Sequence, residues 1–176
     1  MLSELTAMII SAGAAMKTII EFIALLSMIT LVSVHPGFAI DSEHQNLDDS
    51  DLAIQGYDPV SYHAAKPLKG NSEISTTYEG AKYHFASKEN LALFESAPDR
   101  YVPAFGGWCA WAMLDGEKVD IDPETYKVVN DRTYLFYNSF FVNTLTKWNN
   151  LSEKETEKSL AKKAQSNWEA IKATSK

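Results

Sequence analysis

A mainly apolar stretch runs from Ile19 to Val34, close to the N-terminus. Lys17 precedes it, and Pro36-Gly37-Phe38-Ala39 follows it, with small residues on either side of the phenylalanine. A basic residue, an apolar core and a small-x-small site in this order are typical of a secretory signal peptide. We therefore expect residues 1–39 to be removed on export, and the bacterial periplasm to be the location of the mature chain.

Two details of this segment leave alternatives open. The residues before Met16 include Glu4 and no basic side chain, which makes Met16 a candidate for the true start of the protein. An uncleaved membrane anchor is the competing interpretation of the apolar run. The run is short for a spanning helix and contains Glu21, so we expect cleavage and no stable membrane span afterwards.

Beyond the cleavage site, the spacing of apolar positions predicts a leader and then strands. Residues 40–53 are polar and acidic, which predicts a flexible leader. Alternating apolar and polar positions at 74–78 and 82–85 predict a β-hairpin. The same pattern at 126–129 and 134–137 predicts a second hairpin.

Helical spacing dominates the remaining segments. Ser87 is expected to cap a helix that contains Phe94. Towards the C-terminus, apolar residues recur at helical spacing in two stripes, Phe141, Leu145 and Trp148, and then Leu160, Ala164, Trp168 and Ile171. Asn149-Asn150 predicts a break between the two, and a capping box at Ser152 and Glu155 predicts the start of the second helix.

These elements predict an α+β fold. We expect one small domain over residues 54–148, in which two β-hairpins form an antiparallel sheet packed by short helices. Residues 149–176 are expected to form an amphipathic C-terminal helix. The chain carries a formal net charge of −7 at pH 7 and no basic run, which argues against nucleic acid as a partner. Its oligomeric state is left open.

The candidate chemistry centres on the segment from Gly106 to Met113, which contains Cys109, the only cysteine. Cys109 and Met113 are four residues apart, so a helix would place both sulfur atoms on one face. Thiolate and thioether ligands select Cu(I), and the imidazole of His84 would complete a soft three-ligand site. Copper is therefore the candidate cofactor. The simpler interpretation is that Cys109 and Met113 are packing residues of a hydrophobic core.

Other residues support two further interpretations. A thiol-dependent enzyme or redox protein would pair Cys109 with His84 or His63 as the base. Asp58 would orient that base. The sequence has no known nucleophile motif, phosphate loop or paired zinc motif, so we expect binding rather than catalysis. Small-ligand binding in a cleft is also open, and its candidate residues are Asp58, His63, Trp108 and Trp111. A third class is an interaction module that docks through an aromatic surface.

Part of the chain resembles the YHS domain. Matching residues fall at the spacings of that family's pattern, and they are Gly80, Phe85, Ser87, Phe94, Pro98 and Tyr101. Asp58-Pro59-Val60 matches the family's Asp-Pro-Val-Cys opening. The later segments Gly106–Ala112 and Tyr134–Asn138 resemble the exported bacterial branch of the family. The likeness covers residues 54 to about 148.

The resemblance implies metal binding, which in members of the family often accompanies heavy-metal pumps. The family's metal-type cysteines would fall at Ser61, Ala86 and Asn90, and none of these residues is a cysteine here. That ligand set therefore does not carry over, and any metal site must use other residues. A metal site predicts converging ligand atoms, an enzyme predicts a polar cleft around an exposed sulfur, and an interaction module predicts an exposed apolar patch.

Overall fold

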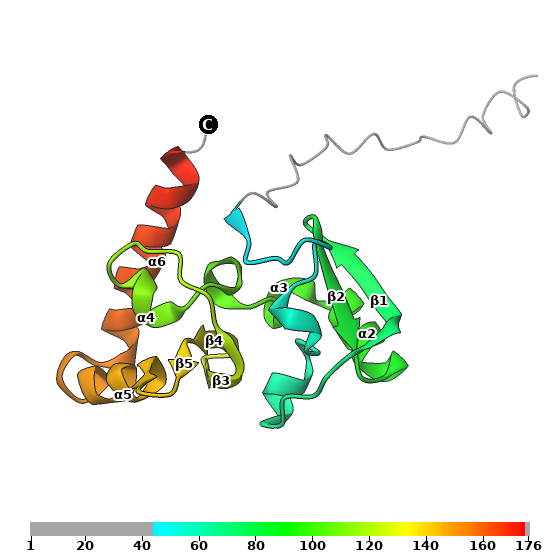
Figure 1. Cartoon of the computed structure of the whole chain (residues 1–176), viewed down its shortest axis with the longest axis horizontal. Helices are drawn as coiled ribbons and strands as arrows, with labels where there is room; N and C mark the ends of the chain where they lie inside the picture. Colours follow the sequence, from blue (N-terminus) through cyan, green and yellow to red (C-terminus); the bar gives the residue numbers. More distant parts are fainter. Residues whose placement is uncertain (1–43, 175–176) are drawn as a thin grey trace, which may run out of the picture. The chain divides into compact units, whose positions relative to one another are not determined.

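The computed structural model describes residues 44–174. These residues form one compact unit. The predicted signal peptide and the start of the predicted leader lie outside the described residues. The described part has the predicted α+β character, with small antiparallel hairpins, short helices and a long C-terminal helix (Figure 1).

The first hairpin pairs β1 (Asn71–Tyr78) with β2 (Ala81–Phe85) in antiparallel register. Its turn is Glu79-Gly80, where the φ angles are 49° and 82°, a left-handed conformation that favours glycine at the second position. Side chains alternate across a strand, so Tyr83 and Phe85 of β2 are both buried on one face.

Two helices follow this hairpin, α2 (Lys88–Ser96) and α3 (Pro98–Tyr101). Ser87 caps α2 as predicted, because its Oγ accepts a hydrogen bond from the backbone N–H of Asn90 at 3.2 Å. Phe94 is 1% exposed and attaches α2 to the hairpin. Its ring packs against the rings of Tyr78, Tyr83 and Phe85.

The second predicted hairpin is also present, with β3 (Asp122–Val129) antiparallel to β4 (Arg132–Phe136). The two hairpins remain separate two-stranded sheets, whereas the sequence predicted a single sheet. One reason is visible at β2, where the backbone of Leu52 forms a parallel bridge to Lys82. Another segment of the chain therefore occupies that strand edge.

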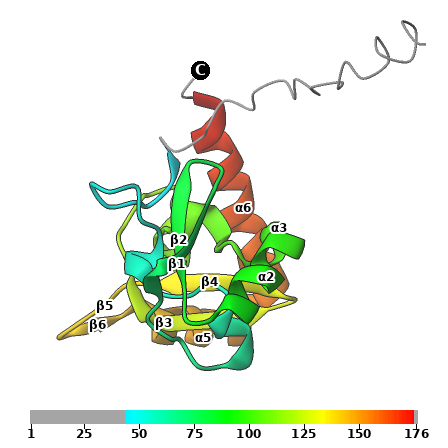
Figure 2. The same cartoon turned by 90° about the vertical axis from the view of Figure 1, so that its right-hand side faces the viewer.

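A third, short hairpin joins β5 (Asn138–Ser139) to β6 (Val142–Asn143) and projects to one side of the domain (Figure 2). Its two-residue turn is Phe140-Phe141. The helical pattern placed Phe141 at the start of a buried stripe, and this prediction is wrong, because its side chain is 99% exposed. The helix starts only at Thr144, with Asn143 as its cap.

The C-terminal helices are α5 (Thr144–Glu155) and α6 (Glu157–Thr174). They are separated by Thr156, whose φ is 64°. The break predicted at Asn149-Asn150 is wrong, because both side chains are exposed and the helix passes through them. Neither α6 nor any other helix of the described residues is both long enough and apolar enough to cross a bilayer.

The second C-terminal helix also begins later than predicted. Its first turn is capped by Thr156, whose Oγ1 accepts a hydrogen bond from the backbone N–H of Ser159 at 3.3 Å. The predicted capping box at Ser152 and Glu155 lies inside α5, so it does not start a helix. Leu160, Ala164 and Trp168 are buried as the apolar stripe predicted.

The described part of the predicted leader packs against the domain. The carbonyl of His44 accepts a hydrogen bond from Trp108 Nε1 at 2.6 Å, and the backbone N–H of Asn46 donates to Gly106 O at 2.8 Å. From His44 onward, the prediction of a flexible leader over residues 40–53 is therefore wrong. Its polar backbone finds partners in the domain, which a polar composition alone does not reveal.

The core has two parts, and the segment from Cys109 to Met113 contributes to both. The first part contains the aromatic residues around Phe94 and includes Cys109. The second lies along α5 and α6 and includes Met113 with Trp148 and Leu160. Helix α4 (Ala110–Met113) thus joins the two, which matters for the site because the two sulfur atoms belong to different clusters.

Candidate ligand-binding site

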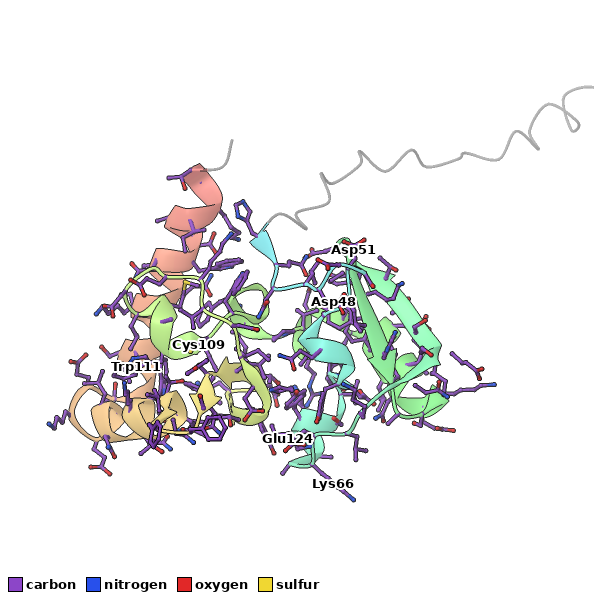
Figure 3. The ribbon with its side chains drawn as sticks, viewed as in Figure 1. Asp48, Asp51, Lys66, Cys109, Trp111 and Glu124 are labelled. Carbon is purple, nitrogen blue, oxygen red and sulfur yellow. The ribbon has the colours of Figure 1, made fainter. Side chains whose placement is uncertain are left out.

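Cys109 is at the N-cap of α4 (Figure 3), and its side chain has no exposed surface. Its Sγ accepts a hydrogen bond from the backbone N–H of Tyr137 at 3.4 Å and lies 3.5 Å from Thr144 Oγ1. The Thr144 hydroxyl donates its one hydrogen to Tyr137 O at 2.8 Å, so the thiol is the donor in its contact with Thr144. The sulfur therefore joins the two ends of the β5–β6 hairpin.

The other two predicted metal ligands have different neighbours. Met113 is fully buried in the second core cluster, where its carbonyl accepts a hydrogen bond from Asn167 Nδ2 at 3.0 Å. His84 lies in β2, and its ring faces Gly56. The structure gives Cys109, Met113 and His84 different neighbours, whereas the copper hypothesis requires their ligand atoms to converge on one point.

The charge around His84 is also unfavourable for a cation. Burial lowers the pKa of this histidine from its ordinary value of 6.5, and Lys82 and Lys69 lower it further, while Asp48 acts in the opposite sense. Among residues 44–174, no three side chains of His, Cys, Asp or Glu gather closely enough to hold a metal ion.

Trp108 and Trp111 are packing residues. The indole N–H of Trp108 donates to His44 O, and Lys118 Nζ lies 5.9 Å from the centroid of its ring. Trp111 packs against both core clusters, with Lys147 Nζ 6.0 Å from its ring centroid. Neither tryptophan lies beside the other two predicted ligand-binding residues, Asp58 and His63.

Asp58 is the centre of a buried hydrogen-bond network. Its Oδ1 accepts from the backbone N–H of Val60 at 2.8 Å. Its Oδ2 accepts from the backbone N–H of Ala86 at 2.9 Å and from Asn90 Nδ2 at 2.6 Å. Its carbonyl accepts from the hydroxyl of Ser61 at 2.6 Å. Asp58 is completely buried, so these contacts replace all of its hydration.

This network occupies the place where the YHS resemblance implied metal-type cysteines. Positions 61, 86 and 90 do converge, and each contacts Asp58. The present residues do not fit a soft metal ion, because Ala86 has no ligand atom in its side chain and Asn90 already donates to the carboxylate. The Ser61 hydroxyl is also used twice, since it accepts from Leu68 N at 3.0 Å besides donating to Asp58.

A surface pocket of about 480 Å³ opens beside this network. Its lining combines apolar and polar side chains, and the residues are Val60, Ser61, His63, Ala64, Lys66, Leu68, Asn90, Leu93 and Tyr101. The first five come from the segment around η3 (Ser61–Ala64), and Asn90 and Leu93 come from α2. A pocket of this volume is in the range that holds small organic molecules.

His63 is the only histidine that lines this pocket. Its ring packs edge-on against Tyr101 with centroids 5.0 Å apart, and its Nε2 lies 3.4 Å from Thr133 Oγ1. Burial lowers the pKa of His63 from its ordinary value of 6.5, Arg100 lowers it further, and Asp131 opposes this. His63 is therefore mainly neutral at pH 7 and can exchange hydrogen bonds with a ligand.

Sequence reasoning identified His63 and Asp58 but not the apolar wall of the pocket. Leu93 is 47% exposed and Leu68 is 37% exposed. In the sequence, Leu93 reads as one more position of a helix and Leu68 as part of a loop. The only available signal was the apolar character of Leu68 in an otherwise polar loop, Lys66-Pro67-Leu68-Lys69.

Comparison with known families identifies one domain in the chain. Residues 60–105 match the model of the YHS domain, so the chain contains a YHS domain over this range. All residues that line the pocket lie within the matched range. No curated protein and no solved structure matches the chain significantly.

Proposed function

We propose that this chain, with its YHS domain at residues 60–105, is a binding protein that captures a small amphipathic anion in the pocket beside His63. The observation that carries the proposal is the composition of the pocket lining. It has an apolar wall, a lysine and a histidine, and no carboxylate, in a chain whose net charge is −7.

Electrostatics favour an anionic group on the ligand. Lys66 lines the pocket, and its side chain points away from the body of the domain (Figure 3). Arg100 also lowers the pKa of His63, but it is paired with Asp131 at 3.4 Å, which offsets its charge, so Lys66 is the main source of positive potential at the pocket. The nearest buried carboxylate, Asp58, has both oxygens occupied by hydrogen-bond donors, which reduces its repulsion of an anion.

The apolar wall would bind the hydrocarbon part of the ligand. Leu68 and Leu93 are both partly exposed, and covering them with a ligand would remove apolar surface from water. A chain of six or seven methylene groups is worth roughly 5 kcal/mol of transfer free energy, at about 0.8 kcal/mol each. Association costs offset much of this gain, so octanoate should bind with a dissociation constant on the order of 1 mM.

Competition binding tests this proposal. Residues 39–176, which contain the compact unit, would be mixed with the fluorescent anion anilinonaphthalene sulfonate and titrated with octanoate. Octanoate should displace the probe. Lys66→Glu should weaken octanoate binding about tenfold at low salt, whereas Lys163→Glu, an identical charge change on α6, should have little effect. Equal effects of the two variants would refute binding at this pocket.

A second pair of variants tests the polar contact. His63→Ala should weaken octanoate binding, and His84→Ala should not, although burial lowers the pKa of both histidines. Loss of binding in the His84 variant alone would move the site to β2.

The alternative functions, copper binding or thiol chemistry at Cys109, have less support because this sulfur is buried and hydrogen-bonded. Export stays a prediction from the N-terminal sequence.

A further inference from the structure

We propose that the β5–β6 hairpin inserts its Phe140-Phe141 turn into the surface of a lipid bilayer. Among residues 44–174, the exposed large apolar side chains fall in two places: Leu68 and Leu93 in the pocket, and Phe140, Phe141 and Val142 on this hairpin. The two phenylalanines are 97% and 99% exposed, and exposed aromatic clusters of this kind mark interaction sites.

The shape of the hairpin fits a lipid surface. The β5–β6 hairpin is a narrow projection (Figure 2), and Phe140 and Phe141 form the two-residue turn at the end of its two-residue strands. The tip extends roughly 7–10 Å beyond the base, at about 3.3 Å per residue. Side chains of interfacial proteins enter the boundary between headgroups and acyl chains to a depth of about 5–10 Å.

The charge pattern fits the same occupant. No residue from Thr133 to Thr146 is charged, so the hairpin can enter the interface without burying a charge. Asn138, Ser139 and Asn143 flank the tip and supply polar, uncharged side chains at headgroup depth. Because the whole chain is acidic, anionic lipids would repel it, and insertion into neutral lipid is expected to provide the binding.

A protein partner fits this hairpin less well. Specific protein interfaces cover about 800 Å² on each partner. Beyond Phe140, Phe141 and Val142, the described residues offer no further exposed large apolar side chain on the hairpin or on α5. A bilayer surrounds a narrow projection from all sides and does not need a broad complementary face.

The base of the hairpin is built to hold the tip in place. Cys109 Sγ contacts Tyr137 N on one strand end and Thr144 Oγ1 on the other, and Thr144 also bonds to Tyr137 O through its backbone and its side chain. Asn138 Nδ2 donates to Asp122 Oδ2 at 3.2 Å, which attaches the first strand to β3. These hydrogen bonds hold the hairpin in a fixed orientation, so little conformational entropy is lost when the two exposed rings insert.

Vesicle sedimentation of residues 39–176 tests the proposal. This unit omits the N-terminal apolar run, which would bind lipid by itself. With neutral phosphatidylcholine vesicles, half of the protein should sediment at roughly millimolar lipid, which is weaker than a single myristoyl chain. Replacing Phe140 and Phe141 together by serine should reduce binding about a hundredfold or more, because each ring is worth about a tenfold factor or more.

The control variant replaces the other exposed apolar pair, Leu68 and Leu93, by serine, and it should sediment like the wild type. Unchanged thermal unfolding of the hairpin variant would show that it is folded, as expected for side chains that contact little else. Adding anionic lipid should not strengthen binding. Absence of binding to neutral vesicles, or equal binding by the hairpin variant, would overturn the proposal, and neither result bears on the pocket beside His63.

Discussion

Replacing Asp58 by alanine tests whether the carboxylate network organises the YHS domain. The change removes the acceptors of three hydrogen bonds, from Val60 N, Ala86 N and Asn90 Nδ2. A buried donor left without a partner costs about 1–3 kcal/mol. Some water will enter the space of the lost side chain, so we expect a total loss of about 3–6 kcal/mol in the free energy of unfolding.

Asparagine at position 58 separates the two oxygens of the carboxylate. Its amide oxygen can replace Oδ2 and keep the bonds from Ala86 and Asn90. Its amide nitrogen then faces the backbone N–H of Val60, where two donors meet. Asp58→Asn should therefore cost about 1–3 kcal/mol, clearly less than Asp58→Ala.

Urea unfolding followed by tryptophan fluorescence measures these losses, with an unchanged slope showing that only stability has changed. Asp48→Ala is the matched control, because Asp48 Oδ1 also accepts two backbone hydrogen bonds, from Ser50 N and Leu52 N, but at an exposed site. The control should cost at most about 1 kcal/mol, since water can replace the lost acceptor. If Asp58→Ala costs no more than the control, the network does not stabilise the domain as argued.

Three further predictions follow from single side chains. Phe94→Ala should lower the free energy of unfolding by about 3–5 kcal/mol, because Phe94 is 1% exposed and packs among other rings, and Ser87→Ala should lower it by about 1 kcal/mol through loss of the helix cap. If urea unfolding shows the larger loss for Ser87→Ala, the packing described for α2 is wrong. Cys109 should resist alkylation in native buffer, with or without Cu(I), and react only when urea unfolds the chain; rapid native labelling would contradict its burial. The folded state holds the pKa values of His63 and His84 below 6.5, so the unfolded chain binds protons more readily, and the free energy of unfolding should decrease as the pH falls below about 6.5. Urea unfolding at several pH values measures this dependence, and replacing both histidines by glutamine should make the free energy of unfolding depend less on pH.

Local pattern was sufficient for most of the fold. Alternation in residues 82–85 predicted the buried face of β2, and Ser87 predicted a helix start, because both depend on short-range geometry. The errors arose where tertiary contacts decide. Phe141 continues a helical stripe in the sequence, yet Asn143 caps α5 after it and leaves the ring in a turn. His44 looks like part of a polar leader until Trp108 supplies a partner for its carbonyl.

The candidate site was only partly predictable for the same reason. Residue types suggested that Cys109, Met113 and His84 form one site, but a spacing of four does not fix which way each side chain points once α4 lies between two core clusters. The pocket beside His63 depends on η3 and α2 lying next to each other, which no local pattern shows. The sequence suggested Asp58 as the residue that orients a catalytic base, whereas its hydrogen bonds give it a structural role in the network beside the pocket.

The most direct test of ligand capture is an amide NMR titration of residues 39–176 with octanoate. Chemical-shift changes should cluster at the pocket, in residues 60–68 around η3 and in residues 90–101 of α2 and α3, and they should saturate in the millimolar range. Shift changes confined to the Phe140-Phe141 turn, or centred on Cys109 and His84, would contradict the proposed site, and so would unchanged spectra at the solubility limit of octanoate.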